Sequence, residues 1–433
     1  MTMNMNSSRI FLTALVALAF MLAPSVRAQD NETILYTFDG THGSGPSSLI
    51  EDSAGNFYGT TQAGGNPANC APLGCGLVFK LSNSTGHWVE TVLHAFNGTT
   101  DGSFPSSIVM DSVGNIFGVA QLGGPAGSGV IFKMTPYAAG WGFKILHAFP
   151  ASASDGTDPD ALTLDAAGNV YGSTAGDTNT THCPASGLGC GLIVKLTPTA
   201  AGPWKENVLH RFSGAPSDGN APDALAFDSA GNLLGLAGAG GAACPNNINI
   251  GCGIVFQLAP TSSGPWTETI LHTFDGTDGS GPYSFFIDAS GTIFGTAFEG
   301  GLPGCNTGTC GVVFSLSSSS AGWTETTIHR FNGARDGNFP YTVVQDASGN
   351  LYSAGAFAGP FSNGTVIELS PTSTATWSET LLFDFPSSTD GTFPDALLVD
   401  ASGNLYGAAF GGGDRTDNGD GLIFQLTPTA SAK

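Results

Sequence analysis

Positive charge is scarce in this sequence. The 433 residues include 12 Lys and Arg against 34 Asp and Glu, which gives a formal net charge of -22. An acidic surface repels phosphate backbones, so the composition argues against a nucleic-acid-binding protein. Acidic polysaccharides and anionic membrane surfaces are disfavoured for the same reason. Charged residues make up only 11% of the chain, so the polar surface must consist mainly of Ser, Thr, Asn and Gly.

Helical periodicity and known catalytic motifs are also missing. Apolar residues beyond the N-terminus occur in short runs between turn signals, which is typical of β-strands. The 63 glycines fit tight turns and close-packed strands. The sequence contains no G-x-S-x-G, no H-E-x-x-H and no phosphate-binding loop. No motif therefore indicates an enzyme class, and the sequence favours a protein without catalysis.

The N-terminus has the features of a secretory signal. Arg9 precedes an uncharged apolar run over residues 10–23, which is too short to span a bilayer. Small residues at Val26 and Ala28 predict cleavage after Ala28. We predict a signal peptide over residues 1–28 and an exported mature chain, extracellular or periplasmic, with no membrane span after cleavage. A retained membrane anchor is the alternative.

The eight cysteines form four close pairs, all at the same point of an internal repeat. The pairs are Cys70/Cys75, Cys183/Cys190, Cys244/Cys252 and Cys305/Cys310. An even number of cysteines in an exported chain predicts disulfides, and pairing within each couple closes the smallest loops. Zinc is the less favoured alternative, because the couples lie in different repeats and lack C-x-x-C spacing.

A phenylalanine in the setting L-H-x-F or L-x-x-F recurs along the chain. The anchors are Phe38, Phe96, Phe149, Phe212, Phe274, Phe331 and Phe385. Each unit contains four short apolar runs, which in the unit after Phe149 cover residues 159–165, 170–174, 191–196 and 204–212. Seven four-stranded units predict an all-β fold, a seven-bladed β-propeller.

The two ends of the mature chain predict how the ring closes. The first unit begins with a lone strand over residues 33–38, and the last unit ends after its third strand, residues 421–426. We predict that the N-terminal strand completes the last blade and that residues 29–433 form a single propeller domain. The expected oligomeric state is a monomer.

Several positions recur in every unit. They read F-x-G-x-x-D-G-x-x-P, then L-x-x-D-x-x-G-N-L-Y-G-T, G-G and G-x-V-F-x-L, most clearly over residues 385–426. This pattern resembles the GloVer (Gloeo-Verruco) tandem repeat of secreted bacterial proteins, over nearly everything after the signal. Some members end in a surface anchor, hence "choice-of-anchor". The chain ends at Lys433 without one, which favours free secretion. The resemblance implies no established activity and supplies no catalytic residues.

Alternate connections of a four-stranded blade share one face. The F-x-G-x-x-D-G-x-x-P connections and the cysteine loops therefore lie together on what we call the loop face, and the D-x-x-G-N turns lie on the other. The loop face has the longer and more variable loops, where binding usually resides. The repeated D-G aspartates on this face are interpreted as turn residues. They are Asp101, Asp155, Asp218, Asp278, Asp336 and Asp390.

Three further aspartates follow the proline that opens the innermost strand. Asp160, Asp223 and Asp395 are expected near the central channel, where carboxylates can hydrogen-bond sugar hydroxyls or hold Ca²⁺. The sequence has no D-x-D-x-D-G loop to support calcium further, so no cofactor is firmly predicted.

Two residues break the repeat on the loop face. Glu299 and Arg335 are ionisable where other units are not, so both are candidate ligand-binding residues. Glu299 is also a weak candidate catalytic acid, since a glycosidase needs a carboxyl pair, here Glu299 with a channel aspartate. The five outer-strand histidines are interpreted as packing, because Tyr36 and Phe383 occupy the same position. They are His94, His147, His210, His272 and His329.

Together these features predict a secreted, non-catalytic propeller that binds a glycan or an exported protein through its loop face. The alternatives are a polysaccharide hydrolase or lyase on the same scaffold, and a structural spacer. Convergence of Glu299, Arg335 and the channel aspartates in one deep pocket would favour the enzyme. A shallow face that is alike in all seven units would favour binding.

Overall fold

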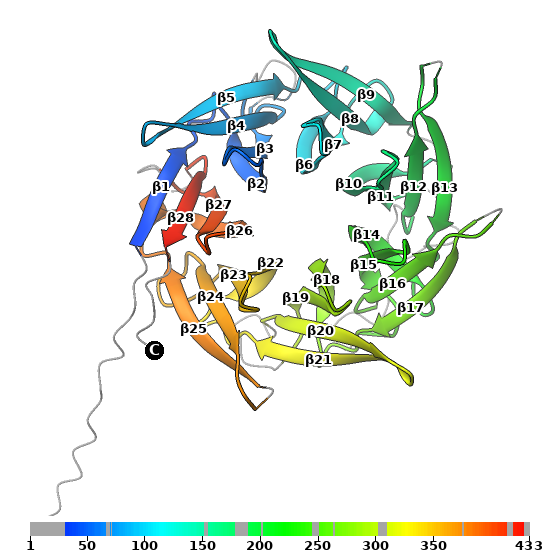
Figure 1. The fold of residues 1–433 in the computed structure, drawn as a ribbon, viewed down its shortest axis with the longest axis vertical. Coiled ribbons are helices and arrows are strands. Elements are labelled where there is room, and N and C mark those ends of the chain that lie inside the picture. The colour runs from blue at the N-terminus through cyan, green and yellow to red at the C-terminus, as the bar shows by residue number, and fades with distance from the viewer. Residues whose placement is uncertain are drawn as a thin grey trace, which may run out of the picture.

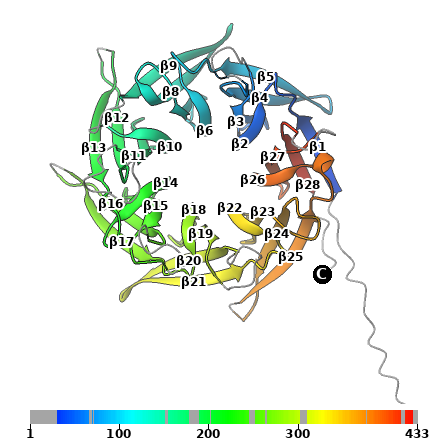
Figure 2. The same cartoon turned by 180° about the vertical axis from the view of Figure 1, so that it is seen from behind.

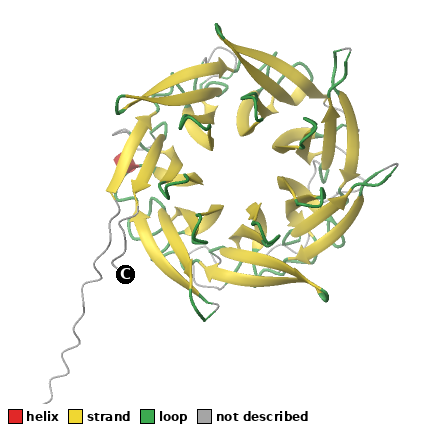
Figure 3. Ribbon diagram, viewed as in Figure 1, coloured by secondary structure: helices red, strands yellow, loops and turns green. Residues whose placement is uncertain are grey.

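The chain forms a ring of seven four-stranded antiparallel sheets in the computed structural model (Figures 1 and 3). The structure describes residues 31–65, 70, 72–150, 155–177, 189–200, 202–244, 251–262, 265–301, 310–374, 376–413 and 419–427. The predicted signal peptide, residues 1–28, lies outside this range. The fold is the all-β, seven-bladed propeller that the repeat predicts.

Six blades are built from consecutive strands, and their first strand is innermost. Blade 1 contains β2 (Ser44–Glu51), β3 (Phe57–Ala63), β4 (Leu77–Ser84) and β5 (His87–Ala95). Blade 2 contains β6 (Ser103–Met110), β7 (Ile116–Leu122), β8 (Gly127–Tyr137) and β9 (Gly140–Pro150). Blade 3 contains β10 (Thr157–Leu164), β11 (Val170–Gly176), β12 (Leu192–Thr197) and β13 (Lys205–Arg211).

The other blades continue the same order around the ring. Blade 4 contains β14 (Gly219–Phe227), β15 (Leu233–Gly240), β16 (Ile254–Ala259) and β17 (Thr267–Thr273). Blade 5 contains β18 (Ser280–Ile287), β19 (Ile293–Glu299), β20 (Val312–Ser319) and β21 (Gly322–Arg330). Blade 6 contains β22 (Asn338–Gln345), β23 (Leu351–Phe357), β24 (Thr365–Pro371) and β25 (Trp377–Asp384).

Blade 7 joins the two ends of the chain. It contains β26 (Thr392–Val399), β27 (Leu405–Gly411) and β28 (Leu422–Thr427), and β1 (Asn31–Thr37) is its outermost strand. Strand β1 pairs antiparallel with β28, with Asn31 opposite Thr427 and Thr37 opposite Leu422 (Figure 1). The predicted closure by the N-terminal strand is therefore confirmed.

The D-x-x-G-N turns are held by their aspartate. In blade 1, the Asp52 carboxylate accepts the backbone N–H groups of Ala54 at 2.9 Å and Asn56 at 3.0 Å. The Tyr58 hydroxyl donates to the other oxygen of the same carboxylate at 3.0 Å. The side chain thus replaces backbone partners in the turn. An aspartate accepts two backbone N–H groups in the same way in the other six blades, at Asp111, Asp165, Asp228, Asp288, Asp346 and Asp400.

The hydrophobic core lies in the seams between blades. Each anchor phenylalanine is buried, with at most 2% of its surface exposed. Phe96, at the end of blade 1, meets Phe132 of blade 2 edge-to-face at 5.4 Å. The Phe132 ring covers Gly118, where a Cβ would lie 2.4 Å from the ring. The glycine of the Y-G step is therefore required by the packing of the third strand, and the core joins each blade to the next.

A second seam contact forms where each inner strand begins, and the sequence alone did not reveal it. The residue before the strand's proline has φ between 54° and 67° in every blade, as at Phe104 (φ 56°). The Phe104 N–H donates to the Cys75 carbonyl of the preceding blade at 3.0 Å. The next residue, Pro105, packs on Gly76, where a Cβ would lie 2.5 Å from the proline ring. We call this contact the proline latch.

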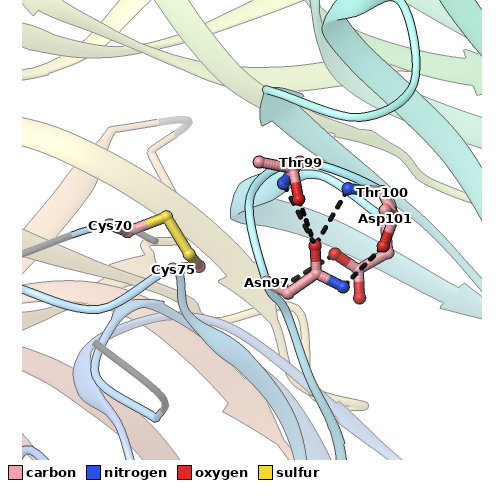
Figure 4. Close-up of a disulfide and its surroundings, with 6 residues drawn as sticks. All are labelled: Cys70, Cys75, Asn97, Thr99, Thr100 and Asp101. Carbon is pink, nitrogen blue, oxygen red and sulfur yellow. Dashed lines mark hydrogen bonds between the residues drawn. A yellow bond between two sulfur atoms is a disulfide. The ribbon is translucent and has the colours of Figure 1, made fainter. Parts of the chain in front are cut away.

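The disulfides support this latch. Cys70–Cys75 and Cys244–Cys252 are bonded as predicted, with Cα atoms 5.2 and 4.9 Å apart. In each pair, the carbonyl of the second cysteine accepts the latch hydrogen bond from the next blade. Figure 4 shows Cys70–Cys75 beside the connection that leads into that blade. Cys190 and Cys310 are also disulfide-bonded, but the predicted partners Cys183 and Cys305 lie outside the described residues.

Helix is almost absent from the described chain. Its one helical element in these ranges is the three-residue 3₁₀ turn η1 (Ser388–Asp390). No described helix has the length and hydrophobicity to cross a membrane.

Candidate binding site at the mouth of the channel

The seven inner strands surround the centre of the ring, as Figures 1 and 2 show from the two sides. A cavity of about 310 Å³ at this centre, which we call the channel, is lined by all seven strands. The residue after the latch proline contributes from every blade. These residues are Ser47, Ser106, Asp160, Asp223, Tyr283, Tyr341 and Asp395. The three aspartates thus lie on the channel wall, and their role in binding stays a prediction.

A larger cavity of about 590 Å³ adjoins the first and shares Tyr283, Tyr341 and Asp395 with it. Its walls come from blades 5, 6 and 7, with Gln62 from blade 1. The lining residues lie where the inner strands begin and the second strands end, which is the edge that bears the loop face. The large cavity therefore forms the mouth of the channel on that face.

Aromatic rings dominate this mouth. We call the following set the aromatic arc: Tyr283, Phe298, Phe339, Tyr341, Phe357, Phe393 and Phe410. Ring centroids are 5.1 Å apart for Tyr283 and Tyr341, and 4.6 Å apart for Phe357 and Phe393. Phe357 and Phe410 remain 40% and 39% exposed. Because contiguous exposed apolar surface is unusual on a soluble protein, the arc has the character of a binding surface.

The latch holds two members of the arc in an unusual backbone conformation. Phe339 and Phe393 have φ values of 54° and 57°, a region that bulky residues rarely adopt. Their N–H groups donate to the Cys310 and Asn363 carbonyls of the preceding blade at 2.9 and 3.0 Å. Strain of this kind persists only where surrounding contacts impose it. The seam geometry therefore sets the position of both rings: Phe393 lines the mouth, and Phe339 contacts Phe357 of the wall, with ring centroids 5.7 Å apart.

The channel carboxyls are shifted toward their protonated forms. Burial, with the charge of Asp160 as a smaller cause, raises the pKa of Asp395 to about 7. Burial and the Asp160 charge also raise the pKa of Asp223 well above its usual value. Burial raises the pKa of Asp160 itself, whose Oδ1 accepts a hydrogen bond from Gln121 at 2.7 Å. With a pKa of about 7, the Asp395 carboxyl can both donate and accept hydrogen bonds to a polar ligand near neutral pH.

Calcium at the three channel aspartates stays a prediction. Among the described residues, the groups of three or more possible ligand residues that come within 4.8 Å of one another lie elsewhere, and none includes Asp160, Asp223 or Asp395.

The structure does not bring Glu299 and Arg335 into either cavity. Glu299 ends β19 opposite Ser280, and its charge contributes, after burial and Asp395, to a raised pKa of Tyr341. Arg335 is exposed in the connection between β21 and β22, where its backbone N–H donates to Asn332. The convergence that would favour an enzyme is therefore not formed by these residues.

The repeated D-G aspartates have structural partners. The Asp101 carboxylate accepts the Asn97 N–H at 2.8 Å, while the Asn97 side chain accepts the N–H groups of Thr99 and Thr100 (Figure 4). Asp101 also lies 3.0 Å from Nε2 of His94. The outer-strand histidines therefore contact these aspartates, although the sequence analysis interpreted the two sets separately.

The aromatic arc was missed from the sequence, yet a signal for it exists. Phe298 and Phe410 occupy the second-strand position that holds Gln62 and Gln121 in blades 1 and 2, and Ala175 in blade 3. Phe339 and Phe393 stand where blades 1, 3, 4 and 5 have Gly, Asp or Ala, although blade 2 also has a phenylalanine there, Phe104. An alignment of the seven units would have shown that aromatic residues replace small or polar ones at these positions, mainly in blades 5 to 7.

Comparison with known proteins identifies the repeat. The family model of the Gloeobacter/Verrucomicrobia repeat matches residues 19–183 and 243–433. The chain belongs to this family. The predicted resemblance to GloVer repeats is thus confirmed over the two matched regions, which span most of the ring. No curated protein matches the chain.

Solved structures similar to this Gloeobacter/Verrucomicrobia repeat protein are distant. A putative gluconolactonase has 10% identity and a TM-score of 0.43, with 92% of both chains covered. A putative oxidoreductase (glucose dehydrogenase) from Thermus thermophilus has 12% identity and a TM-score of 0.44, covering 92% of this chain and 100% of its own. A putative 6-phosphogluconolactonase from Bacteroides uniformis has 11% identity and a TM-score of 0.47, covering 77% and 85%. These similarities assign no activity to the present chain.

Proposed function

We propose that this propeller is a secreted, non-catalytic protein that binds a glycan at the mouth of its channel. The observation that supports the proposal is the aromatic cavity of about 590 Å³, which is continuous with a ring of Asp, Tyr and Ser side chains. A sugar ring has an apolar face and a polar edge. Aromatic rings pack on the first, and carboxyl and hydroxyl groups bind the second.

The charge of the protein limits the kind of glycan. The chain carries a net charge of -22, and three of the channel-lining residues are carboxyls. A glycan with many carboxylates or sulfates would be repelled. We therefore expect a neutral or basic glycan. Disulfides in the loops of the repeats support an oxidising compartment, as secretion would provide.

A glycan-array experiment on residues 29–433, with calcium and with a chelator, tests the proposal. We expect neutral or basic glycans to be retained, and mass spectrometry to recover them intact. Loss of binding in chelator would assign the channel aspartates to a metal. Shortened or unsaturated glycans would replace the proposal with the hydrolase or lyase alternative. The absence of any retained glycan would overturn it in favour of a protein partner.

Variants of the arc locate the binding site. Phe357→Ala and Phe393→Ala each remove an exposed ring from the cavity wall, and we expect each to weaken glycan binding by about tenfold or more. Tyr137→Ala is the matched control, because Tyr137 is 66% exposed at the end of β8, away from the channel lining. Equal affinity for all three variants would exclude the arc.

A further inference from the structure

The outer rim of the ring carries a repeated cluster at the seams. The outer-strand histidine of one blade, the D-G aspartate that follows it, and the outer-strand glutamate of the next blade come together there. Ligand atoms lie within 4.8 Å of one another in three such groups: His147/Asp155/Glu206, His210/Asp218/Glu268 and His329/Asp336/Glu379. None of these residues lines the channel cavities.

The seam between blades 3 and 4 lacks the histidine–aspartate hydrogen bond that His94, His272 and His329 form at three equivalent seams. Nε2 of His210, on β13, lies 3.6 Å from Oδ1 of Asp218 and 3.6 Å from Oε1 of Glu268, on β17. These separations are too long for hydrogen bonds. Both His210 Nε2 and Glu268 Oε1 are buried without a hydrogen-bond partner. A buried polar atom without a hydrogen-bond partner costs folding free energy. Two such atoms that lie side by side therefore indicate a site where a ligand can bind both.

The separations fit a metal ion. Zinc binds nitrogen and oxygen ligands at about 2.0–2.1 Å in tetrahedral geometry, which places neighbouring ligand atoms roughly 3.4 Å apart. The observed 3.6 Å is close to this value. One imidazole and two carboxylates also give the site a negative charge, which favours a divalent cation over water alone.

The surrounding contacts fix the position of one ligand. The Asp218 carboxylate accepts the Ser213 N–H at 2.7 Å and the Ser213 hydroxyl at 2.9 Å on Oδ2. The Gly219 N–H donates to Oδ1 at 2.6 Å. Each oxygen that ligates a metal keeps a second lone pair, so these contacts orient the carboxylate without excluding an ion.

The seam between blades 4 and 5 supplies a natural contrast. There His272 Nε2 lies 2.9 Å from Asp278 Oδ2 and forms a hydrogen bond, and Glu325 accepts the Thr327 hydroxyl at 3.0 Å. The same three repeat positions are thus satisfied by internal hydrogen bonds. A metal ion there would have to displace them.

We propose that His210, Asp218 and Glu268 bind a divalent transition-metal ion of the zinc class, with water as the remaining ligand. The ion would join β13 of blade 3 to β17 of blade 4 at the rim. This site is separate from the proposed glycan site, so each proposal can fail without the other. The His147/Asp155/Glu206 group, in which His147 Nε2 and Glu206 Oε1 also lack hydrogen-bond partners, is a second place for the same ion.

Metal titration of the mature chain tests the proposal. Chelator-treated protein is dialysed, then titrated with Zn²⁺ by calorimetry and with Co²⁺ by visible absorption, which reports tetrahedral coordination. We expect wild-type protein to bind Zn²⁺, and its Tm to rise with Zn²⁺ relative to chelator. His210→Gln should lose at least one bound ion per chain, or bind it more than about tenfold more weakly.

His272→Gln is the matched control and should bind as wild type does. Glu268→Gln repeats the test if His210→Gln fails to fold, because it keeps the shape of the side chain. Equal binding by wild type, His210→Gln and Glu268→Gln would overturn the site, as would wild-type protein that binds no Zn²⁺. An equal loss of ions in His272→Gln would also overturn it, because the effect would then not be specific to this seam.

Discussion

The two sides of the channel mouth share one backbone and differ in chemistry. On the side of blades 5 to 7, the wall is aromatic, with Phe298, Phe357 and Phe410 at the ends of the second strands. On the side of blades 3 and 4, the equivalent strand ends carry small residues, and Asp160 and Asp223 face the channel. In Figure 1, blades 3 and 4 lie on the right of the ring, and blades 5 to 7 follow from the bottom to the left.

This difference between the two sides of the mouth shows which positions of the repeat can vary without changing the fold. The turns, anchors and latches are the same in every blade and set the geometry. The chemistry of the channel mouth then depends on a few positions that vary between units, namely the residues on either side of the latch proline and the end of the second strand. An asymmetric site on a symmetric scaffold needs substitutions at these positions alone.

The largest effect is expected from removing the strand that closes the ring. Deletion of residues 29–40 takes β1 from blade 7 and leaves the edge of β28 unpaired. We expect loss of the cooperative unfolding transition, and hence loss of both sides of the mouth, in thermal melts followed by circular dichroism. A melt at the wild-type temperature would contradict the view that β1 closes the structure.

Substitution of one core phenylalanine and one phenylalanine of the aromatic arc compares their contributions to stability. Phe96→Ala removes a fully buried anchor and should cost about 3–5 kcal/mol of folding free energy. Phe393 is 36% exposed, and Ala221 adopts the same positive φ in blade 4, so Phe393→Ala should cost less than about 1 kcal/mol. Urea unfolding measures both. Similar losses of folding free energy in the two variants would show that Phe393 is part of the core, as Phe96 is.

We expect the acidic side to contribute less to the proposed glycan binding than the aromatic side. Asp160→Asn keeps the shape of a residue that already accepts a hydrogen bond from Gln121, and exchanges a carboxyl for an amide. We expect glycan affinity to fall by only a few-fold, about 1 kcal/mol, in calorimetry. A larger loss than that of Phe357→Ala would reverse the comparison and make the carboxyls the main contact.

The smallest effect is a pH dependence of stability from Asp395. Its pKa is raised to about 7 by burial and by Asp160, so the folded state holds its proton more tightly than the unfolded state. Stability from this group is therefore present at low pH and is lost as the pH rises from about 4 to 7.

Asp395→Asn should remove that loss. A pKa raised from about 4 to about 7 corresponds to roughly 4 kcal/mol in full. Because Asp395 is only partly buried, solvent reduces this value, and we expect the variant to gain on the order of 1 kcal/mol of stability relative to wild type at pH 8 compared with pH 4. Thermal melts of both proteins at the two pH values measure the difference. A variant that tracks wild type at both values would show that Asp395 ionises as an exposed carboxyl does.

The strands could be predicted closely from sequence because their signals are local. The unit after Phe149 was expected at residues 159–165, 170–174, 191–196 and 204–212, and the strands cover 157–164, 170–176, 192–197 and 205–211. Alternating apolar residues, D-x-x-G-N turns and glycine pairs all act within a few residues of the chain. The position of Asp160, Asp223 and Asp395 at the channel followed from the same register.

Glu299 and Arg335 show the limit of that approach. Both were selected because they are unusual within the repeat, yet neither lines either of the two channel cavities. A residue that is unusual within the repeat can point in any direction, so its rarity does not predict which residues it contacts. Six of the seven members of the aromatic arc do line the larger cavity, yet they are residue types that are ordinary in the core of a strand.

By itself, the sequence determined the number of blades, their strands and the closure by β1, because each depends on periodicity and turn chemistry within one unit. Only the tertiary structure decided which residues meet across the seams. The proline latch, the aromatic arc and the His210/Asp218/Glu268 cluster all join neighbouring blades. Such contacts depend on how two twisted sheets pack against each other. The sequence pattern within one unit does not specify that packing.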